Sequence, residues 1–278
     1  MRRLLLNQAL AVLVLTTVVA CDDDTSSGGG GNGAGGQATG GEATGAGGQG
    51  ANTAGGGGQG GGVVEGLSAT WTVTEMLAPV PPNNLEWQTV GPLADFEICL
   101  LDGSKCSTTD ASGVAMIPGL PENTNFAVVQ QGAGFSPLLT QYVMLTSDLA
   151  IGSYTASDAE LGGFIASAGC TIPPAAGKAN LWVGLPPGAS VTSAPALTFV
   201  YGGADGVFDP ALTEVPVATP PSVAQAVACD IDPGTFELTI QNALGSCAMY
   251  EGWPPAGNGD IQALTVADMT TVVNWICN

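Results

Sequence analysis

A long glycine-rich tract sets the first limit on what this chain can fold into. Residues 22–62 contain 20 glycines in 41 positions, most of the others are Ala, Thr, Gln, Ser or Asn, and none is aromatic. Such a segment cannot bury a hydrophobic core, and it is expected to be a disordered, flexible tether with a root-mean-square span of about 35 Å. The roughly 215 residues that follow must carry the fold, which is enough for one or two small domains.

An apolar segment that ends in cysteine precedes this tract. Two arginines near the start supply positive charge, residues 9–20 are nearly all apolar, and a small residue, Ala20, comes directly before Cys21. This order is typical of a signal peptide. The apolar run of about a dozen residues is well short of the roughly 20 that a membrane-spanning helix needs. The chain is therefore expected to leave the cytoplasm.

The end of this segment, Val18-Val19-Ala20-Cys21, resembles the bacterial lipobox. In that motif an aliphatic residue, a small or aliphatic residue and Ala or Gly precede the cysteine that receives acyl chains such as palmitate. The resemblance implies that residues 1–20 are a signal peptide and that residues 21–62 are a lipidated cysteine and its tether. Several acyl chains would anchor the protein stably, since each buried methylene contributes about 0.8 kcal/mol. The resemblance places the protein in the cell envelope, either at the outer membrane or at the periplasmic face of the inner membrane.

The acidic charge of the chain and its lack of histidine exclude some classes of partner and of catalytic site. There are 24 acidic residues against four Lys and Arg, and no histidine. A surface this negative is repelled by phosphate backbones, so nucleic acid is excluded as a partner. Without imidazole there is no Ser-His-Asp triad and no histidine-ligated zinc. We therefore expect no enzyme, no catalytic residues, no cofactor and no metal site, although a hydrolase that uses carboxylates alone stays an alternative.

Short strands begin at about residue 66, where apolar and polar residues start to alternate between turn residues. Phe96, Ile98 and Leu100 would share one face of a strand. The next residues include Asp102-Gly103, a pair that favours a tight type I′ hairpin turn.

This hairpin predicts a disulfide. Counting outward from the turn places Cys99 opposite Cys106, within the distance that a disulfide bridges. An exported chain with six cysteines left after Cys21 is suited to three bridges. A bridge closing a loop of about eight residues would stabilise the fold by roughly 2–3 kcal/mol.

A run of motifs follows the hairpin. It consists of Thr109-Asp110-Ala111-Ser112-Gly113, a strand at 114–117, Gly119-Leu120-Pro121, a strand at 124–129 and Gly134-Phe135. This order resembles the carboxypeptidase regulatory-like domain, a transthyretin-like β-sandwich, over about residues 92–137. The resemblance implies a sandwich over residues 63–156 that accompanies an enzyme rather than being one. The zinc ligands of the peptidase have no counterparts here.

The second half of the chain is expected to form another sandwich over residues 170–278. Ser157 and Glu160 have capping-box spacing, which predicts a short connecting helix over residues 157–169. Later strands are predicted at 179–183, 196–201, 235–240, 261–266 and 270–276. The four cysteines here, Cys170, Cys229, Cys247 and Cys277, allow three connectivities. We favour Cys247–Cys277, which leaves Cys170–Cys229.

Two kinds of residue could bind a ligand. Asp102, Asp110, Asp205, Asp209 and Asp260 lie in turns and could supply oxygen to calcium, but no D-x-D-x-D spacing supports this and solvated turn residues are the simpler interpretation. Of the tryptophans, Trp253 lies between Gly252 and two prolines, which favours an exposed loop that could contact a ligand.

The sequence as a whole predicts an all-β protein with one or two small antiparallel β-sandwich domains, transthyretin-like or Ig-like, after a disordered linker. The expected function is that of a non-enzymatic, membrane-anchored surface lipoprotein with a structural, adhesive or ligand-display role. An accessory protein that binds carbohydrate or peptide is the alternative. Its partners would then be the membrane, through the lipid anchor, and an extracellular protein or glycan.

Overall fold

The computed structural model describes residues 66–144, 146–241, 247–249, 252–257 and 260–277. The predicted signal peptide, Cys21 and the glycine-rich tether lie outside these residues. The described part belongs to one compact unit, and its regular structure is almost entirely β-strand, with one short α-helix and two 3₁₀ turns. The predicted all-β sandwich fold is confirmed.

The strands of the first half alternate with tight turns, as the sequence pattern predicts. They are β1 (Leu67–Leu77), β2 (Gln88–Pro92), β3 (Glu97–Leu100), β4 (Cys106–Thr108), β5 (Val114–Leu120), β6 (Thr124–Gly132), β7 (Phe135–Met144) and β8 (Leu149–Thr155).

The second half begins with α1 (Asp158–Ile165) and η1 (Ala166–Ala168). Its remaining elements are β9 (Ala179–Gly184), β10 (Ser190–Ala194), β11 (Val200–Gly202), β12 (Phe208–Asp209), η2 (Pro221–Val223), β13 (Gln225–Ile231), β14 (Gly234–Gln241), β15 (Cys247–Met249), β16 (Ile261–Thr265) and β17 (Thr270–Cys277). Of the five strands predicted here, the one at 196–201 is much shorter than expected, and β10, β12, β13 and β15 were not predicted.

The described residues form three sheets. The front sheet contains β1, β2, β5 and β8, and the cover sheet contains β10, β14 and β16. The central sheet has ten strands, in the order β12-β11-β13-β9-β17-β7-β6-β3-β4, with β15 beside β17.

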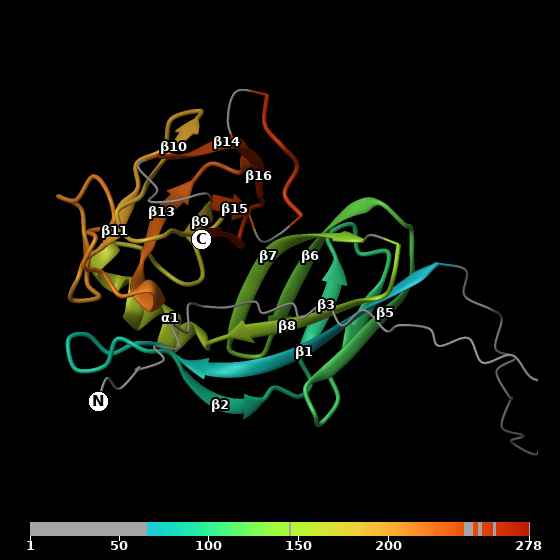
Figure 1. Ribbon diagram of the computed structural model, residues 1–278. Helices are drawn as coiled ribbons and strands as arrows, with labels where there is room; N and C mark the ends of the chain where they lie inside the picture. Colours follow the sequence, from blue (N-terminus) through green and yellow to red (C-terminus); the bar gives the residue numbers. More distant parts are fainter. Residues whose placement is uncertain (1–65, 145, 242–246, 250–251, 258–259, 278) are drawn as a thin grey trace, which may run out of the picture. The chain divides into compact units, whose positions relative to one another are not determined.

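The central sheet continues from one half of the chain into the other (Figure 1). The link is β17, which pairs in parallel with β9 on one side and with β7 on the other. The two ranges expected to form sandwiches, 63–156 and 170–278, therefore share one sheet. Parallel pairs are a departure from the expected antiparallel arrangement, and β8 also runs parallel to β1.

The two faces of the central sheet contribute to different hydrophobic cores. Neighbouring residues of a strand point to opposite faces, so Val128 packs in core 1 and Val129 in core 2. Core 1 lies between the front and central sheets, and includes Trp71, Phe96, Ile98, Ala115, Ile117, Phe126 and Tyr142. Core 2 lies between the cover and central sheets, and includes Leu139, Leu181, Val183, Phe236, Leu238, Trp253 and Val273.

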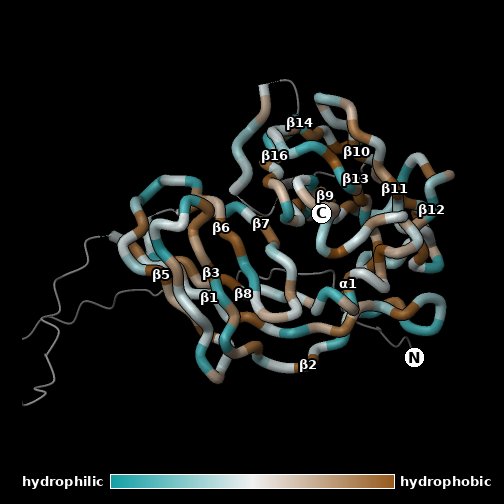
Figure 2. The backbone as a smooth tube through the Cα atoms, turned by 180° about the vertical axis from the view of Figure 1, so that it is seen from behind, coloured by the Kyte–Doolittle hydropathy of each residue, from teal (hydrophilic) through white to brown (hydrophobic). Residues whose placement is uncertain are grey.

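Strands at the middle of the central sheet are consequently buried on both faces. In β9 the first five residues, Ala179 to Val183, are all buried, and the sequence there is nearly continuous in apolar residues. Elsewhere hydrophobic and hydrophilic stretches follow one another along the chain (Figure 2). In β5, for example, Ala115 and Ile117 are buried whereas Met116 is exposed.

A third core holds the connecting helix. Leu161, Phe164 and Ile165 of α1 are buried, and the ring of Phe164 stacks on Trp182 of β9 with centroids 5.9 Å apart. The predicted cap is present, because the Ser157 side chain accepts a hydrogen bond from the amide of Glu160. The Glu160 carboxylate does not return to the cap residue; it accepts from the amide of Ala78 at 3.1 Å and so ties the helix to the segment after β1.

Candidate functional site

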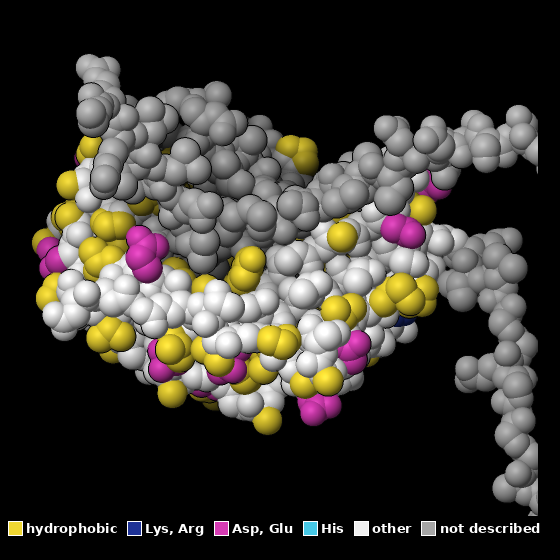
Figure 3. Space-filling model, turned by 60° about the horizontal axis from the view of Figure 1, so that its bottom comes forward, with side chains coloured by type: hydrophobic (Ala, Val, Ile, Leu, Met, Phe, Trp, Pro, Cys, Tyr) yellow, Lys and Arg dark blue, Asp and Glu magenta, His cyan; other side chains and the backbone are white. Residues whose placement is uncertain are grey.

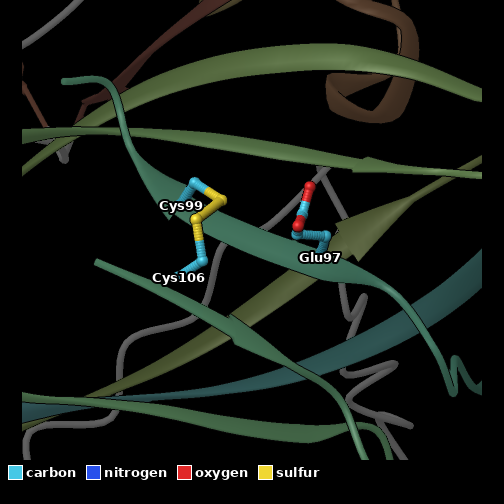
Figure 4. A group of neighbouring side chains, drawn as sticks. All are labelled: Glu97, Cys99 and Cys106. Carbon is cyan, nitrogen blue, oxygen red and sulfur yellow. A yellow bond between two sulfur atoms is a disulfide. The ribbon is translucent and has the colours of Figure 1, made fainter. Parts of the chain in front are cut away.

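Three side chains with metal-binding atoms lie together on β3 and β4. They are Glu97, Cys99 and Cys106, and one ligand atom of each lies within 4.8 Å of the others, the one such group of three among the described residues. Figure 4 shows that a disulfide links the two cysteines across the neighbouring strands, with the Glu97 carboxylate further along β3. This cluster is the candidate functional site.

Strand register places the two cysteines. Cys99 and Cys106 are directly opposed in the antiparallel β3–β4 pair, with their Cα atoms 4.1 Å apart, and they form the predicted disulfide. Glu97 precedes Cys99 by two residues, so the two side chains share a face of the sheet, while Ile98 points into core 1. A carboxylate two positions before Cys99 is the sequence signal that could have predicted this neighbour.

The turn of this hairpin differs from the predicted one. The loop is closed by hydrogen bonds from Gly103 N to Leu100 O and from Leu100 N to Lys105 O. Gly103 has a positive φ of 69°, but Asp102 does not share this conformation, so the expected type I′ turn is wrong. Instead the Asp102 carboxylate accepts from the amide of Ser104 at 2.9 Å, which stabilises a longer loop.

Lys105 fastens the hairpin to the front sheet. Its Nζ donates to the carbonyl oxygens of Pro118, at 2.7 Å, and Gly119, at 2.6 Å, at the end of β5. Since Lys105 and Cys106 are adjacent in an extended segment, their side chains leave on opposite sides. The ammonium group is therefore directed away from the cysteines.

Glu97 is held in place from the other neighbouring strand. Gln131 of β6 lies opposite Glu97 in register, and its Nε2 donates to Glu97 Oε2 at 2.7 Å. The site thus consists of a half-buried carboxylate, a half-buried cysteine and an exposed one. While the disulfide is intact, its sulfur atoms are not thiolate ligands, and the arrangement is that of a surface bridge beside an oriented carboxylate.

The second disulfide has a different environment. Cys170, after the helix, is bonded to Cys229 of β13, and both sulfurs belong to core 3. The cysteines are 59 positions apart. By the chain-entropy model, closing a loop of about 60 residues contributes about 4 kcal/mol. This bridge is therefore expected to matter more for stability than Cys99–Cys106.

The remaining two cysteines face each other in the backbone register. Cys247 of β15 pairs with Cys277 of β17. Their side chains lie outside the described residues, so a bridge between them stays a prediction.

Trp253 is not the exposed loop residue that the sequence predicted. Its side chain is only 4% exposed and packs in core 2. The reason lies in Gly252, whose amide donates to Gln141 O and whose carbonyl accepts from the Asn125 side chain. These bonds lay the segment against β6 and β7, and the indole turns inward. The indole is therefore not available to contact a carbohydrate or peptide ligand, as an exposed loop residue would be.

The turn aspartates accept hydrogen bonds from backbone amides, four of them from amides two to four residues further along the chain and Asp260 from the distant strand β14. Their partners are Ser104 for Asp102, Ser112 and Val114 for Asp110, Val207 for Asp205, Ala211 for Asp209 and Ile240 for Asp260. Hydrogen bonds from Ser112 and Val114 hold the pKa of Asp110 below its ordinary value, and bonds from Ser104 do the same for Asp102. These five residues do not gather into one cluster, and each has a structural role of its own.

The few cations of the folded part are engaged within the protein. Besides Lys105, Lys178 forms a salt bridge with Asp232 at 2.6 Å. On the face in Figure 3 the acidic side chains stand in separate small groups, with hardly any Lys or Arg among them. Such a surface disfavours anionic partners.

The predicted lipidation site, Cys21, lies outside the described residues. Within the part of the chain that the structure describes, no helix has the length and apolar character needed to cross a membrane.

Comparisons with known proteins identify no family. No protein-family model and no curated protein matches the chain. One similar solved structure is a type II cohesin–X–dockerin complex from Acetivibrio cellulolyticus, at 15% identity, 34% coverage of this chain, 55% of that chain and a TM-score of 0.23. Another is the Bacillus anthracis TIE protein, at 12% identity, 75% coverage of this chain, 33% of that chain and a TM-score of 0.23. The chain thus spans little more than half of one and a third of the other, and at this TM-score neither likeness bears on function.

Proposed function

We propose that this protein is a non-enzymatic lipoprotein of the bacterial cell envelope, which carries a folded β unit on a long tether. The observation that carries the proposal is the segment Val18-Val19-Ala20-Cys21, placed between an apolar run and a glycine tract. Acyl chains on Cys21 would hold the protein in the outer membrane or at the periplasmic face of the inner membrane. Residues 22–62 would let the folded unit stand clear of the lipid surface.

The folded unit suits a structural, adhesive or ligand-display role. Two disulfides brace it, and one central sheet runs through both halves of the chain. With 24 acidic residues and no histidine in the chain, an uncharged glycan or a basic protein surface is a more suitable partner than a polyanion.

A regulatory-like domain is part of the same proposal. The motif resemblance over residues 92–137 supports it, and the structure has β3, β4, β5, β6 and the start of β7 in this range. In this interpretation the unit accompanies or presents other proteins and performs no catalytic step itself.

Lipidation can be tested in bacteria that process lipoproteins. Cells would express the full chain, Cys21→Ser, or the control Ser26→Ala, and would be fed a palmitate analogue that carries a chemical tag. The natural chain and Ser26→Ala are expected to acquire the tag and partition into detergent, because multiple acyl chains anchor them stably. Cys21→Ser is expected to stay untagged. If Cys21→Ser were tagged and partitioned like the natural chain, the proposal would be wrong.

A further inference from the structure

The Cys99–Cys106 bridge is placed where a reductant can reach it without disturbing a core. Cys106 is exposed on the short strand β4 at the end of the central sheet, whereas Cys170 is buried in core 3. The loop that Cys99–Cys106 closes is also the shorter one, with a separation of 7 positions against 59. Breaking this bridge raises the conformational entropy of the unfolded chain less than breaking Cys170–Cys229 does. The fold should therefore survive the loss of Cys99–Cys106.

The hairpin has other attachments that would keep the reduced cysteines opposed. Strand β3 is paired with β6 through four residues, from Glu97 to Leu100. Lys105 binds two carbonyl oxygens at the end of β5, and the Ser107 hydroxyl accepts from Met116 N at 3.2 Å. These contacts hold both strands independently of the disulfide.

We propose that reduction of this bridge creates a binding site for a thiophilic divalent metal ion of the zinc class, with Cys99, Cys106 and Glu97 as its ligands. A dithiol supplies two electrons and two protons to the S–S bond, which breaks to give two thiols as the dithiol becomes a disulfide; with a phosphine, one water supplies the two protons and the oxygen of the phosphine oxide. The metal ion then displaces one proton from each thiol and binds two thiolates and one carboxylate oxygen. Water completes the tetrahedral set that zinc prefers.

The geometry of the site suits these ligands. Two thiolates on one tetrahedral zinc ion lie roughly 3.8 Å apart, as follows from a Zn–S distance of about 2.3 Å. Opposed residues of an antiparallel pair can provide this separation by side-chain rotation, and the Glu97 carboxylate is already within 4.8 Å of both sulfurs. The hydrogen bond from Gln131 orients the carboxylate, as second partners of metal ligands commonly do.

The nearest lysine does not compete with a metal ion for the Glu97 carboxylate. Lys105 is the nearest lysine in sequence, and its ammonium group is occupied at Pro118 and Gly119. The site thereby gives the chain a ligand-binding state that depends on the redox conditions around it. This inference does not require lipidation, so its failure and that of the proposed function are separate outcomes.

The experiment uses the full chain, purified in detergent, in oxidised form and after treatment with limiting phosphine reductant. Differential alkylation and mass spectrometry identify the bridge that opens first, and Zn²⁺ binding is measured by competition with a chromogenic chelator. Co²⁺ is a second probe, whose thiolate charge-transfer band reports sulfur ligation. We expect Cys99–Cys106 to open first, and the reduced protein to bind one Zn²⁺ per chain at a site that the oxidised protein lacks.

Variants separate this site from the other cysteines. The double variant Cys99→Ser/Cys106→Ser keeps every other cysteine and is expected to lack the site. Glu97→Gln should weaken Zn²⁺ binding by about tenfold or more, whereas Glu122→Gln, which removes an exposed carboxylate elsewhere, should bind as the natural chain does. Circular dichroism should report the same strand content before and after limiting reduction.

Four results would overturn the inference. They are equal Zn²⁺ binding by the double variant, equal binding by Glu97→Gln and Glu122→Gln, opening of Cys170–Cys229 before Cys99–Cys106, and loss of the strand signal on limiting reduction.

Discussion

Thr271 of β17 pairs in parallel with Leu139 of β7, and this contact joins the two halves of the chain into one sheet. Leu139 is fully buried in core 2, although β7 belongs to the first half. The side chain thus contributes to the core of the second half. The two halves are expected to unfold together.

Leu139→Ala tests this coupling. Removing a fully buried leucine side chain should destabilise the protein by about 2–5 kcal/mol. Denaturant unfolding followed by tryptophan fluorescence should show one transition, with its midpoint at a lower denaturant concentration in the variant. Hydrogen exchange should be faster in both β1 and β14, which belong to different halves of the chain. Val217→Ala, at a side chain that is 69% exposed, is the control and should shift the midpoint little. Separate transitions, with only one half affected, would contradict the shared sheet.

Gly252→Ala tests the packing that buries Trp253. A Cβ at Gly252 would overlap the backbone of Tyr142 and Val143, whereas one at Gly257 meets only the Glu237 carboxylate, at 3.9 Å. Gly252→Ala should therefore cost about 1–3 kcal/mol, the usual range for forced overpacking. Gly257→Ala should be close to neutral. Chemical denaturation measures both, and equal stability of the two variants would show that the segment does not rest on β7.

Acid should selectively weaken the turn at Asp110. Hydrogen bonds from Ser112 and Val114 lower the pKa of this carboxyl below its ordinary value, so the ionised form stabilises the fold above the unfolded-state pKa. That contribution is lost as the pH falls through the lowered pKa. Asp110→Asn should have a lower melting temperature than the natural chain at neutral pH, and this difference in melting temperature should become smaller below about pH 4. Thermal melts from neutral to acid pH measure the difference, with Glu122→Gln as the control. A difference that stays constant with pH would count against this role.

A third disulfide is expected between Cys247 and Cys277. The two residues are opposed in the β15–β17 pair, and opposed residues of an antiparallel pair are close enough to bridge. Without reduction, peptide mapping should recover a linked peptide that contains both cysteines. Recovery of either residue as a free thiol, or bonded to a different cysteine, would refute this pairing.

Features set by short-range chemistry could be predicted from the sequence. The Cys99–Cys106 pair follows from strand alternation around a turn, and the Ser157 cap follows from one side chain beside the first amides of a helix. Even here the predicted type I′ turn is wrong, because the Asp102 carboxylate accepts a hydrogen bond from the amide of Ser104 and stabilises a different loop.

The sequence by itself determined that the folded part is built of short strands bridged by cysteines, because alternation and turn residues act over a few positions. Only the tertiary structure decided that β7 and β17 share a sheet, that Trp253 is buried, and that Gln131 of β6 donates a hydrogen bond to Glu97 of β3. These contacts join residues that are distant in sequence or in different strands. Local patterns do not encode the register and the packing of sheets on each other that bring such residues together.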